Sequence, residues 1–463
     1  MTDTLTHTKL QPQFYLLVFL VSIGFFMQGL DTTIINTALP AMAISLQEDP
    51  LKMHGVVISY VLAVAACIPL SGWFSDRFGV RNTYFAAIVI FTTASIGCAL
   101  SNSFNTLILF RVFQGIGGAF LMPVGRLAML RIIPRGQFLS AMSTMSLAGL
   151  LGPLAGPILG GWLVEYVSWH WIFLINVPIG LLGMLVTFKA MPNVTEASVK
   201  SFDFSGFILL AIAMVGIALG IESIASQEIS KAMSLSLLVA GIIATLIYAY
   251  HAHTHQNALF RSRLFKSKIY TIGILGNFFA RFSSNAVPFI LPLMLQVAFK
   301  MEPFMTGVMM TPIVIGSLVS KPIIRPILQR TGYRAILIVN TLLIGICIAA
   351  FSLHTADTPT WVRALHFFAF GVINSLQFVS MNTFTLKDLP QQDASSGNSF
   401  LSMIMMLSMS IGIAVAGTLL NMFTHYFSSA HITQAFHYTL ICLGLINIVT
   451  MLIFLQIPKE YKD

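Results

Sequence analysis

An acidic residue inside a long apolar run is the first position where this sequence could do chemistry. Asp31 lies near the end of the run at residues 14–36, and a second charge, Arg111, lies inside the run at residues 105–127. An ionisable group within a membrane span costs at least ~2.5–3.5 kcal/mol, so it faces a bundle interior or a wet cavity. Burial favours the neutral form of a carboxyl group. Asp31 is therefore predicted to load and release a proton, and a membrane protein that keeps both charges is predicted to move a substrate.

The composition defines the class of protein that must position these charges. The chain has 463 residues, of which 56% are hydrophobic and only 9% are charged, whereas soluble domains carry about 25% charged residues. Its mean hydropathy is +0.85. We expect an all-α membrane protein rather than an enzyme, because no Ser/His/Asp, paired-acid or metal-ligand constellation shares one region. No metal or cofactor is expected, although the cluster of His251, His253 and His255 leaves metal binding open as a minor alternative.

Fourteen apolar runs are long enough to cross a bilayer. Their approximate limits are 14–36, 55–75, 83–101, 105–127, 139–163, 170–190, 204–224, 233–252, 269–298, 304–323, 334–354, 361–385, 398–423 and 434–456. Most of the 25 Lys and Arg residues fall at the two termini and in alternate loops. The positive-inside rule then places both termini in the cytoplasm and explains the net charge of +9 without nucleic-acid binding.

A weak internal repeat divides these runs into two halves. Residues 71–81 follow the second run, and the similar residues 326–334 follow the tenth. If the seventh and eighth runs are an insertion, six spans remain on each side, which is the pattern of a two-bundle transporter. We expect a first bundle at residues 1–200, two inserted helices at 201–268 and a second bundle at 269–463.

Residues 72–81, Gly-Trp-Phe-Ser-Asp-Arg-Phe-Gly-Val-Arg, resemble the loop signature of the major facilitator superfamily. The resemblance implies a fold of two six-helix bundles. It also implies a cytoplasmic gate, in which a tight loop presents Asp76 to a helix N-terminus of the other half, where an anion is stabilised. The gate residues are Gly72, Asp76, Arg77, Gly79 and Arg81. Ordinary topological charge is the alternative interpretation.

Two further segments resemble motifs of this superfamily. Residues 111–119 are similar to its fourth-helix motif, which implies that Arg111 biases the protonation of nearby carboxylates such as Asp31; a structural ion pair is the alternative. Residues 149–161 are similar to the fifth-helix motif of its antiporters. Their glycines recur every four residues and form a flat ridge for close helix packing, and the resemblance implies a hinge and seal against the other half. The hinge residues are Gly152, Pro153, Gly156, Pro157, Gly160 and Gly161.

Residues 30–40 and 169–180 look like signatures of the fourteen-span drug:proton antiporters, the EmrB/QacA type, with His170 where a cation is usual. Residues 393–399 favour the MdtD/HsrA branch. The resemblance implies a bacterial inner-membrane antiporter that exports amphipathic or aromatic molecules by alternating access, driven by protons. We expect a monomer, and the resemblance leaves open whether a periplasmic adaptor takes part. A dedicated exporter of a native metabolite, lipid or siderophore, and a non-transporting sensor, are the alternatives.

Polar side chains within the spans are candidates for the wall of a substrate cavity. Hydrogen bonding between helices is an equally reasonable role for several of them. The candidates are Gln28, Asn36, Gln114, Arg281, Asn285, Asn374 and Gln377.

Overall fold

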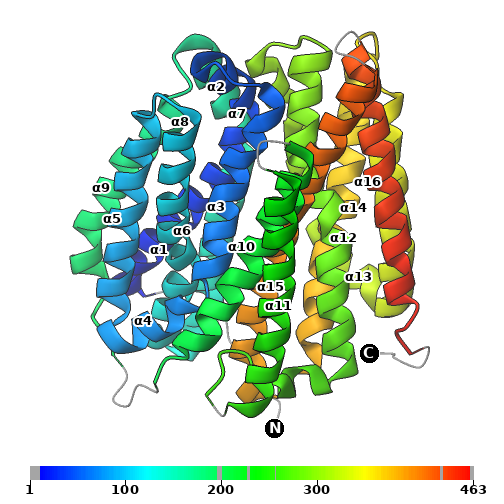
Figure 1. The fold of residues 1–463 in the computed structure, drawn as a ribbon. Helices are drawn as coiled ribbons and strands as arrows, with labels where there is room; N and C mark the ends of the chain where they lie inside the picture. The colour runs from blue at the N-terminus through cyan, green and yellow to red at the C-terminus, as the bar shows by residue number, and fades with distance from the viewer. Residues whose placement is uncertain (1–10, 196–200, 227–229, 256, 428–430, 459–463) are drawn as a thin grey trace.

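The computed structural model is a bundle of long, roughly parallel helices with both chain ends at one end of the bundle (Figure 1). It describes residues 11–195, 201–226, 230–255, 257–427 and 431–458. Within this described part, thirteen helices are long and apolar enough to cross a membrane, and no strand occurs. The remaining expected span, at 139–163, coincides with the 32-residue helix α7. The chain is therefore an all-α, multi-pass membrane protein.

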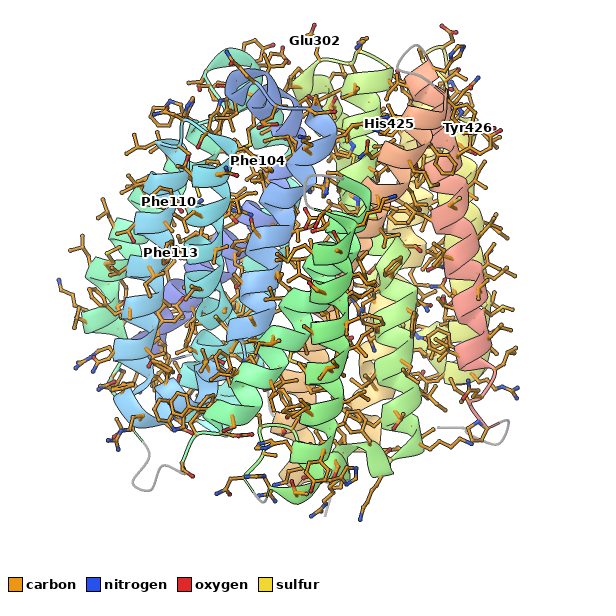
Figure 2. All side chains as sticks on the ribbon, in the orientation of Figure 1. Phe104, Phe110, Phe113, Glu302, His425 and Tyr426 are labelled. Carbon is orange, nitrogen blue, oxygen red and sulfur yellow. The ribbon has the colours of Figure 1, made fainter. Side chains whose placement is uncertain are left out.

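The first half is built from nine helical segments that form six membrane-crossing units. They are α1 (Pro12–Ile34), α2 (Leu39–Leu46), α3 (His54–Cys67), α4 (Leu70–Phe78), α5 (Val80–Ala99), α6 (Phe104–Ile132), α7 (Arg135–Tyr166), α8 (Trp171–Leu174) and α9 (Asn176–Ala190). Outward-facing side chains such as Phe113 of α6 are apolar, as a surface in contact with lipid requires (Figure 2).

The second half contains five helices, of which α13 is broken by a turn at Gly332 into two spans. They are α12 (Lys268–Leu293), α13 (Pro303–Ala350), α14 (Thr360–Lys387), α15 (Gln391–Phe427) and α16 (Ile432–Phe454). Two more helices, α10 (Phe204–Ser226) and α11 (Lys231–Thr254), run side by side between the halves (Figure 1). Short 3₁₀ or π segments cover Ile35–Thr37, Pro50–Met53, Ser262–Lys266, Met294–Ala298 and Phe351–Leu353.

The inserted pair is fastened at the end near the termini by one carboxylate. Both oxygens of Asp203 contact Nε2 of His251, at 2.8 and 2.9 Å, and Oδ2 also accepts the backbone N–H of Leu259. His251 therefore has a structural role, in the contact between α11 and the beginning of α10. No cluster of three metal-ligating side chains occurs among the described residues.

The second span differs from the continuous run that we expected at 55–75. Helix α3 ends at Cys67 and α4 begins at Leu70, on either side of Pro69. Proline lacks the N–H of a helical hydrogen bond and its ring clashes with the preceding turn. Most of the expected gate loop is consequently helical, and only Gly79 makes the turn, with φ 86° and ψ 152°.

The internal repeat is visible in the backbone. Gly332 of the second half adopts φ 71° and ψ 163°, close to the conformation of Gly79 in the first half. Both residues lie in a region of positive φ that L side chains rarely adopt, so glycine is required at each turn. The two short motifs therefore mark the same turn in both halves.

The two halves meet at the end of the bundle away from the termini. The side-chain amide of Gln296 donates to the carbonyl of Thr37 over 2.9 Å, and the carboxylate of Glu165 accepts the N–H of Phe304 over 2.9 Å. Phe304 lies in the first turn of α13, where exposed N–H groups favour an anion.

Candidate functional site

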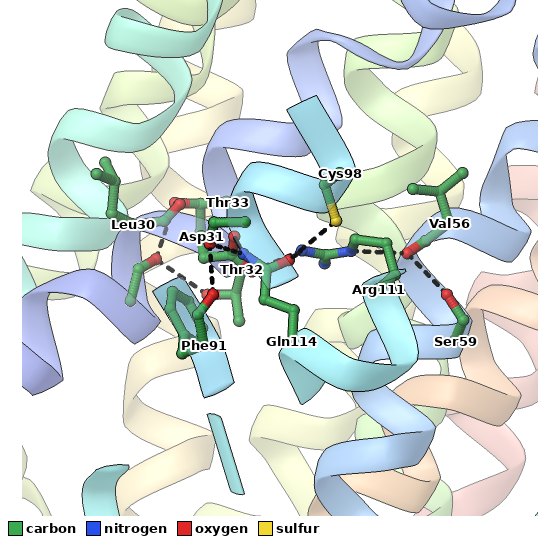
Figure 3. Close-up of polar contacts among 12 residues, drawn as sticks. Leu30, Asp31, Thr32, Thr33, Val56, Ser59, Phe91, Cys98, Arg111 and Gln114 are labelled. Carbon is green, nitrogen blue, oxygen red and sulfur yellow. Dashed lines mark hydrogen bonds and ion pairs between the residues drawn. The ribbon is translucent and has the colours of Figure 1, made fainter. Parts of the chain in front are cut away.

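Asp31 and Arg111 form an ion pair in the middle of the first half. An η-nitrogen of Arg111 lies 2.8 Å from Oδ2 of Asp31, and both side chains are fully buried (Figure 3). Asp31 comes from α1 and Arg111 from α6, eighty residues apart. The structure thus brings together the two charges that the sequence singled out.

Gln114 joins both members of this ion pair. Its amide nitrogen donates to Oδ1 of Asp31 over 2.9 Å, and its amide oxygen accepts from Arg111 over 2.6 Å. The same nitrogen donates to Ser95 over 2.8 Å. Gln114, which we expected to line a cavity, has no exposed surface and belongs to the charged network.

The guanidinium of Arg111 has further partners besides the carboxylate. Its Nε donates to the carbonyl of Val56 over 3.1 Å, and its Cζ lies 4.2 Å from the ring centroid of Tyr60. Such a cation–π contact is worth about 2 kcal/mol or more when desolvated. Nothing in the sequence marks Ser95, Val56 or Tyr60 as members of this network. Only Gln114 could have been found, because residues three apart share a helix face.

The glycine ridge of α7 packs on α1, within the same half. A side chain at Gly152 would meet the backbone of Leu30 at 2.7 Å, and one at Gly156 would meet Oγ1 of Thr33 at 2.1 Å. Gly160 is equally close to Ile34. The ridge therefore fixes the backbone on either side of Asp31.

The contact of this motif with the other half comes from two of the expected hinge residues, Pro157 and Gly161, and not from the glycine ridge. Gly161 lies against the backbone of Pro303, and Pro157 lies against Gly307 of α13. Pro153 contacts Gly29 of α1. Helix α7 thus separates α1 from α13, with the ridge on one side and Pro157 and Gly161 on the other.

The gate motif makes a contact that the sequence did not predict. The carboxylate of Asp76 pairs with Arg131 at the end of α6, in the same half, and not with a helix N-terminus of the other half. Gly72 and Arg77 are exposed. Arg81 stacks on Phe188 of α9, with 5.5 Å between its Cζ and the ring centroid. The cross-half latch is therefore not formed among the described residues.

A second buried cation lies in the other half. Arg281 of α12 is 3% exposed, and it donates to the side-chain oxygens of Asn277 at 2.8 Å and Asn382 at 2.9 Å. Its Cζ lies 3.7 Å from the ring centroid of Phe378, which remains 42% exposed. No carboxylate pairs with Arg281 in the described part of the chain. Asn285, one turn further along α12, is half-buried.

The other cavity candidates divide into two groups. Gln377 of α14 forms hydrogen bonds to α13, which is the alternative role for such residues. Its amide nitrogen donates to Thr341 over 2.7 Å, and its amide oxygen accepts from Asn340 over 3.0 Å. Gln28 and Asn36 are buried with a side-chain oxygen that lacks a partner among the described residues. Asn374 is half-buried on α14.

His170 is held as an interface residue just before α8. Its ring stacks on Trp169 with 3.8 Å between centroids, and Nδ1 lies 2.6 Å from Oγ of Ser168. Burial lowers the pKa of His170 below its usual range. These contacts make His170 a poor substitute for a fixed cation.

Similarity to known proteins identifies the family of this chain. The profile of the Major Facilitator Superfamily matches residues 21–413 and 273–463. The chain is 47% identical over 451 residues to a Salmonella newport (strain SL254) protein named "Putative multidrug resistance protein MdtD", covering 96% of this chain and 95% of the relative. It is 46% identical over 446 residues to the protein of the same name from Serratia proteamaculans (strain 568), covering 96% and 93%.

Solved structures share the fold at low sequence identity. A D-xylose-proton symporter superposes with a TM-score of 0.68 at 15% identity, covering 97% of this chain and 99% of the symporter. A POT family transporter in complex with 5-aminolevulinic acid gives 0.70 at 17% identity, covering 95% and 94%. Sequence, profile and fold agree, and the chain belongs to the major facilitator superfamily of membrane transporters.

Proposed function

We propose that this transporter is a proton-coupled antiporter that exports amphipathic or aromatic small molecules across the bacterial inner membrane by alternating access. The name of the relatives, which refers to multidrug resistance, supports the substrate class. The distribution of Lys and Arg supports cytoplasmic termini. The protein acts as a monomer in this proposal, with the proton gradient as its energy source and no bound cofactor.

The observation that carries the proposal is the buried Asp31–Arg111–Gln114 network. Protonation of Asp31 removes its charge and weakens the ion pair with Arg111. A buried cation that loses its partner is costly, by about 3–5 kcal/mol. Here Arg111 keeps the carbonyl of Val56, the oxygen of Gln114 and the ring of Tyr60 as partners when Asp31 is neutral.

The packing of α1 supports a route from protonation to helix movement. The backbone beside Asp31 lies on the ridge of α7, and the opposite side of α7 lies on α13 of the second half. A change in the rotation of α1 therefore acts on α7, the helix of the first half that packs against α13. Coupling further requires that proton and substrate prefer different facing states, because a ligand shifts an equilibrium only by its differential affinity.

The test compares the wild type with Asp31→Asn in everted membrane vesicles, using a dye that reports the proton gradient. Addition of a cationic or aromatic drug is expected to release protons through the wild type and not through the variant. Thr93→Ala, which removes an exposed hydroxyl that donates to the backbone carbonyls of Val89 and Ile90 in its own helix, serves as the control. Proton release at the wild-type level by Asp31→Asn would exclude Asp31 as the coupling group.

A second candidate function is export of a dedicated acidic metabolite. The specific observation is Arg281, a buried cation whose described partners are amide and backbone oxygens and an aromatic ring. Within a membrane span such a cation is retained where it faces a cavity or binds an anion. A narrow substrate profile restricted to acids would favour this candidate over multidrug export.

A further inference from the structure

A cavity of about 390 Å³ lies at the end of the bundle that carries the termini, away from the Asp31 network. The beginning of α1, the beginning of α5, the end of α6 and the segment at the end of α9 surround it. Its lining residues are Gln13, Phe14, Leu17, Arg81, Ile132, Phe188, Lys189, Ala190, Met191 and Pro192. Because four membrane-crossing helices begin or end here, the cavity lies at the level of the lipid headgroups.

Two cations face this cavity without an anionic partner. Neither Arg81 nor Lys189 forms an ion pair within the described part of the chain. Nε of Arg81 is shielded from solvent and has no hydrogen-bond partner among the described residues. A shielded donor without an acceptor carries a free-energy cost. An anion bound between the two side chains would remove that cost.

The walls of the cavity are ordered by contacts that do not use these cations. The N–H of Val80 donates to the carbonyl of Val194 over 3.2 Å, and the amide of Asn193 donates to the carbonyl of Phe78 over 3.3 Å. These bonds hold the segment after α9 against the turn between α4 and α5. Arg81 itself lies on the ring of Phe188. The position of Arg81 is therefore set before any ligand binds, whereas the exposed Lys189 is free to close on a bound anion.

The surface beside the cavity is apolar and outward-facing. On α1, Tyr15, Leu16 and Phe19 are exposed, and on α9 Leu185 and Phe188 are exposed. Helices α1 and α9 contact each other, so these side chains form one flank beside the cavity and its two cations. The arrangement matches an amphipathic anion, with its charge in the cavity and its chains along the flank.

We propose that this cavity binds the phosphate headgroup of an anionic phospholipid, with Arg81 and Lys189 as the phosphate ligands and the α1/α9 flank as the acyl-chain surface. Basic pockets between membrane helices bind anionic headgroups, and each Lys or Arg near the membrane surface contributes about 1 kcal/mol. Inorganic phosphate shares the headgroup chemistry but cannot use the apolar flank. The site is independent of the transported substrate.

The experiment uses the purified, delipidated full-length protein in a neutral detergent. Native mass spectrometry measures the binding of dioleoylphosphatidylglycerol, with dioleoylphosphatidylcholine and inorganic phosphate as comparison ligands. The wild type is expected to prefer phosphatidylglycerol over both. Lys189→Gln and Arg81→Gln are each expected to weaken that binding about fivefold, the equivalent of one cation. Lys268→Gln, an exposed cation at the start of α12, is expected to leave it unchanged.

Three results would overturn the proposal. Equal binding of phosphatidylcholine would show that the flank alone retains lipid. Binding of inorganic phosphate as tight as that of the lipid would identify a site for a soluble anion. Unchanged phosphatidylglycerol binding in Lys189→Gln, whose side chain is exposed and tolerant of substitution, would exclude the cavity even if Arg81→Gln failed to fold.

Discussion

Gln114 contacts both charges of the central ion pair, donating to Asp31 over 2.9 Å and accepting from Arg111 over 2.6 Å. One amide thereby gives the Asp31 carboxylate a second donor and the Arg111 guanidinium a second acceptor. Its position fixes the orientation of the Asp31 carboxylate. Gln114 therefore belongs to the same hydrogen-bonded unit as the ion pair.

The first prediction concerns this amide. Gln114→Leu leaves Oδ1 of Asp31 and the hydroxyl of Ser95 without their shared donor, and each unsatisfied buried group costs about 1–3 kcal/mol. We expect lower thermal stability and an altered pH dependence of drug-induced proton release. Cys98→Ala is the control, since it removes only a weak 3.8 Å contact with the same amide. A wild-type pH profile in Gln114→Leu would remove Gln114 from the coupling network.

The second prediction concerns the ridge of α7. A Cβ at position 156 would lie 2.1 Å from Oγ1 of Thr33 and 3.0 Å from the backbone nitrogen of Ile34, so Gly156→Ala requires the Thr33 side chain or one of the two helices to move. Overpacking of this kind costs about 1–3 kcal/mol. Gly149→Ala on the same helix would make only an ordinary 3.5 Å contact with Phe25. Thermal unfolding in detergent should show a loss for Gly156→Ala and none for Gly149→Ala; equal effects would mean that helix propensity, and not close packing, explains the motif.

The third prediction separates the two candidate functions at Arg281. If acidic compounds are exported, Arg281→Gln removes a charge-assisted bond worth about 1.5–3 kcal/mol, which is about 10- to 150-fold in affinity. Arg281→Lys keeps the charge but loses the planar stacking on Phe378 and should be intermediate. The measurement is transport of an acidic and a cationic fluorescent compound of similar size. An equal loss for both compounds would indicate a structural role for Arg281.

The fourth prediction concerns the pH dependence of stability and His354, which follows the short 3₁₀ segment after α13. Burial, followed by the neighbouring charges of His366, Arg363 and His437, lowers the pKa of His354 to about 4. The unfolded chain therefore binds this proton more readily than the folded one between about pH 6.5 and 4, and stability falls as the pH falls through that window. His354→Gln should reduce the decline in melting temperature between pH 7 and pH 4.5. An unchanged decline would assign the pH dependence to other groups.

Much of the fold follows from the sequence because a bilayer imposes one strong rule. Backbone polar groups within lipid must be satisfied inside the segment, so long apolar runs become helices. The fourteen expected runs agree roughly with the structure, although Pro69 divides the second and the sixth is divided between α8 and α9. The same rule draws attention to Asp31 and Arg111, since charges inside such runs are costly.

The tertiary structure decided which side chains meet. Lipid-facing and bundle-facing positions are both apolar here, so the sequence does not encode the rotation of each helix about its axis. That rotation places Gln114 beside Asp31, turns the glycine ridge toward α1, and pairs Asp76 with Arg131 within one half. The spans, the family resemblance and the two central charges can be read from the amino-acid order. The partners of those charges cannot, because they depend on distances between helices that are far apart in the chain.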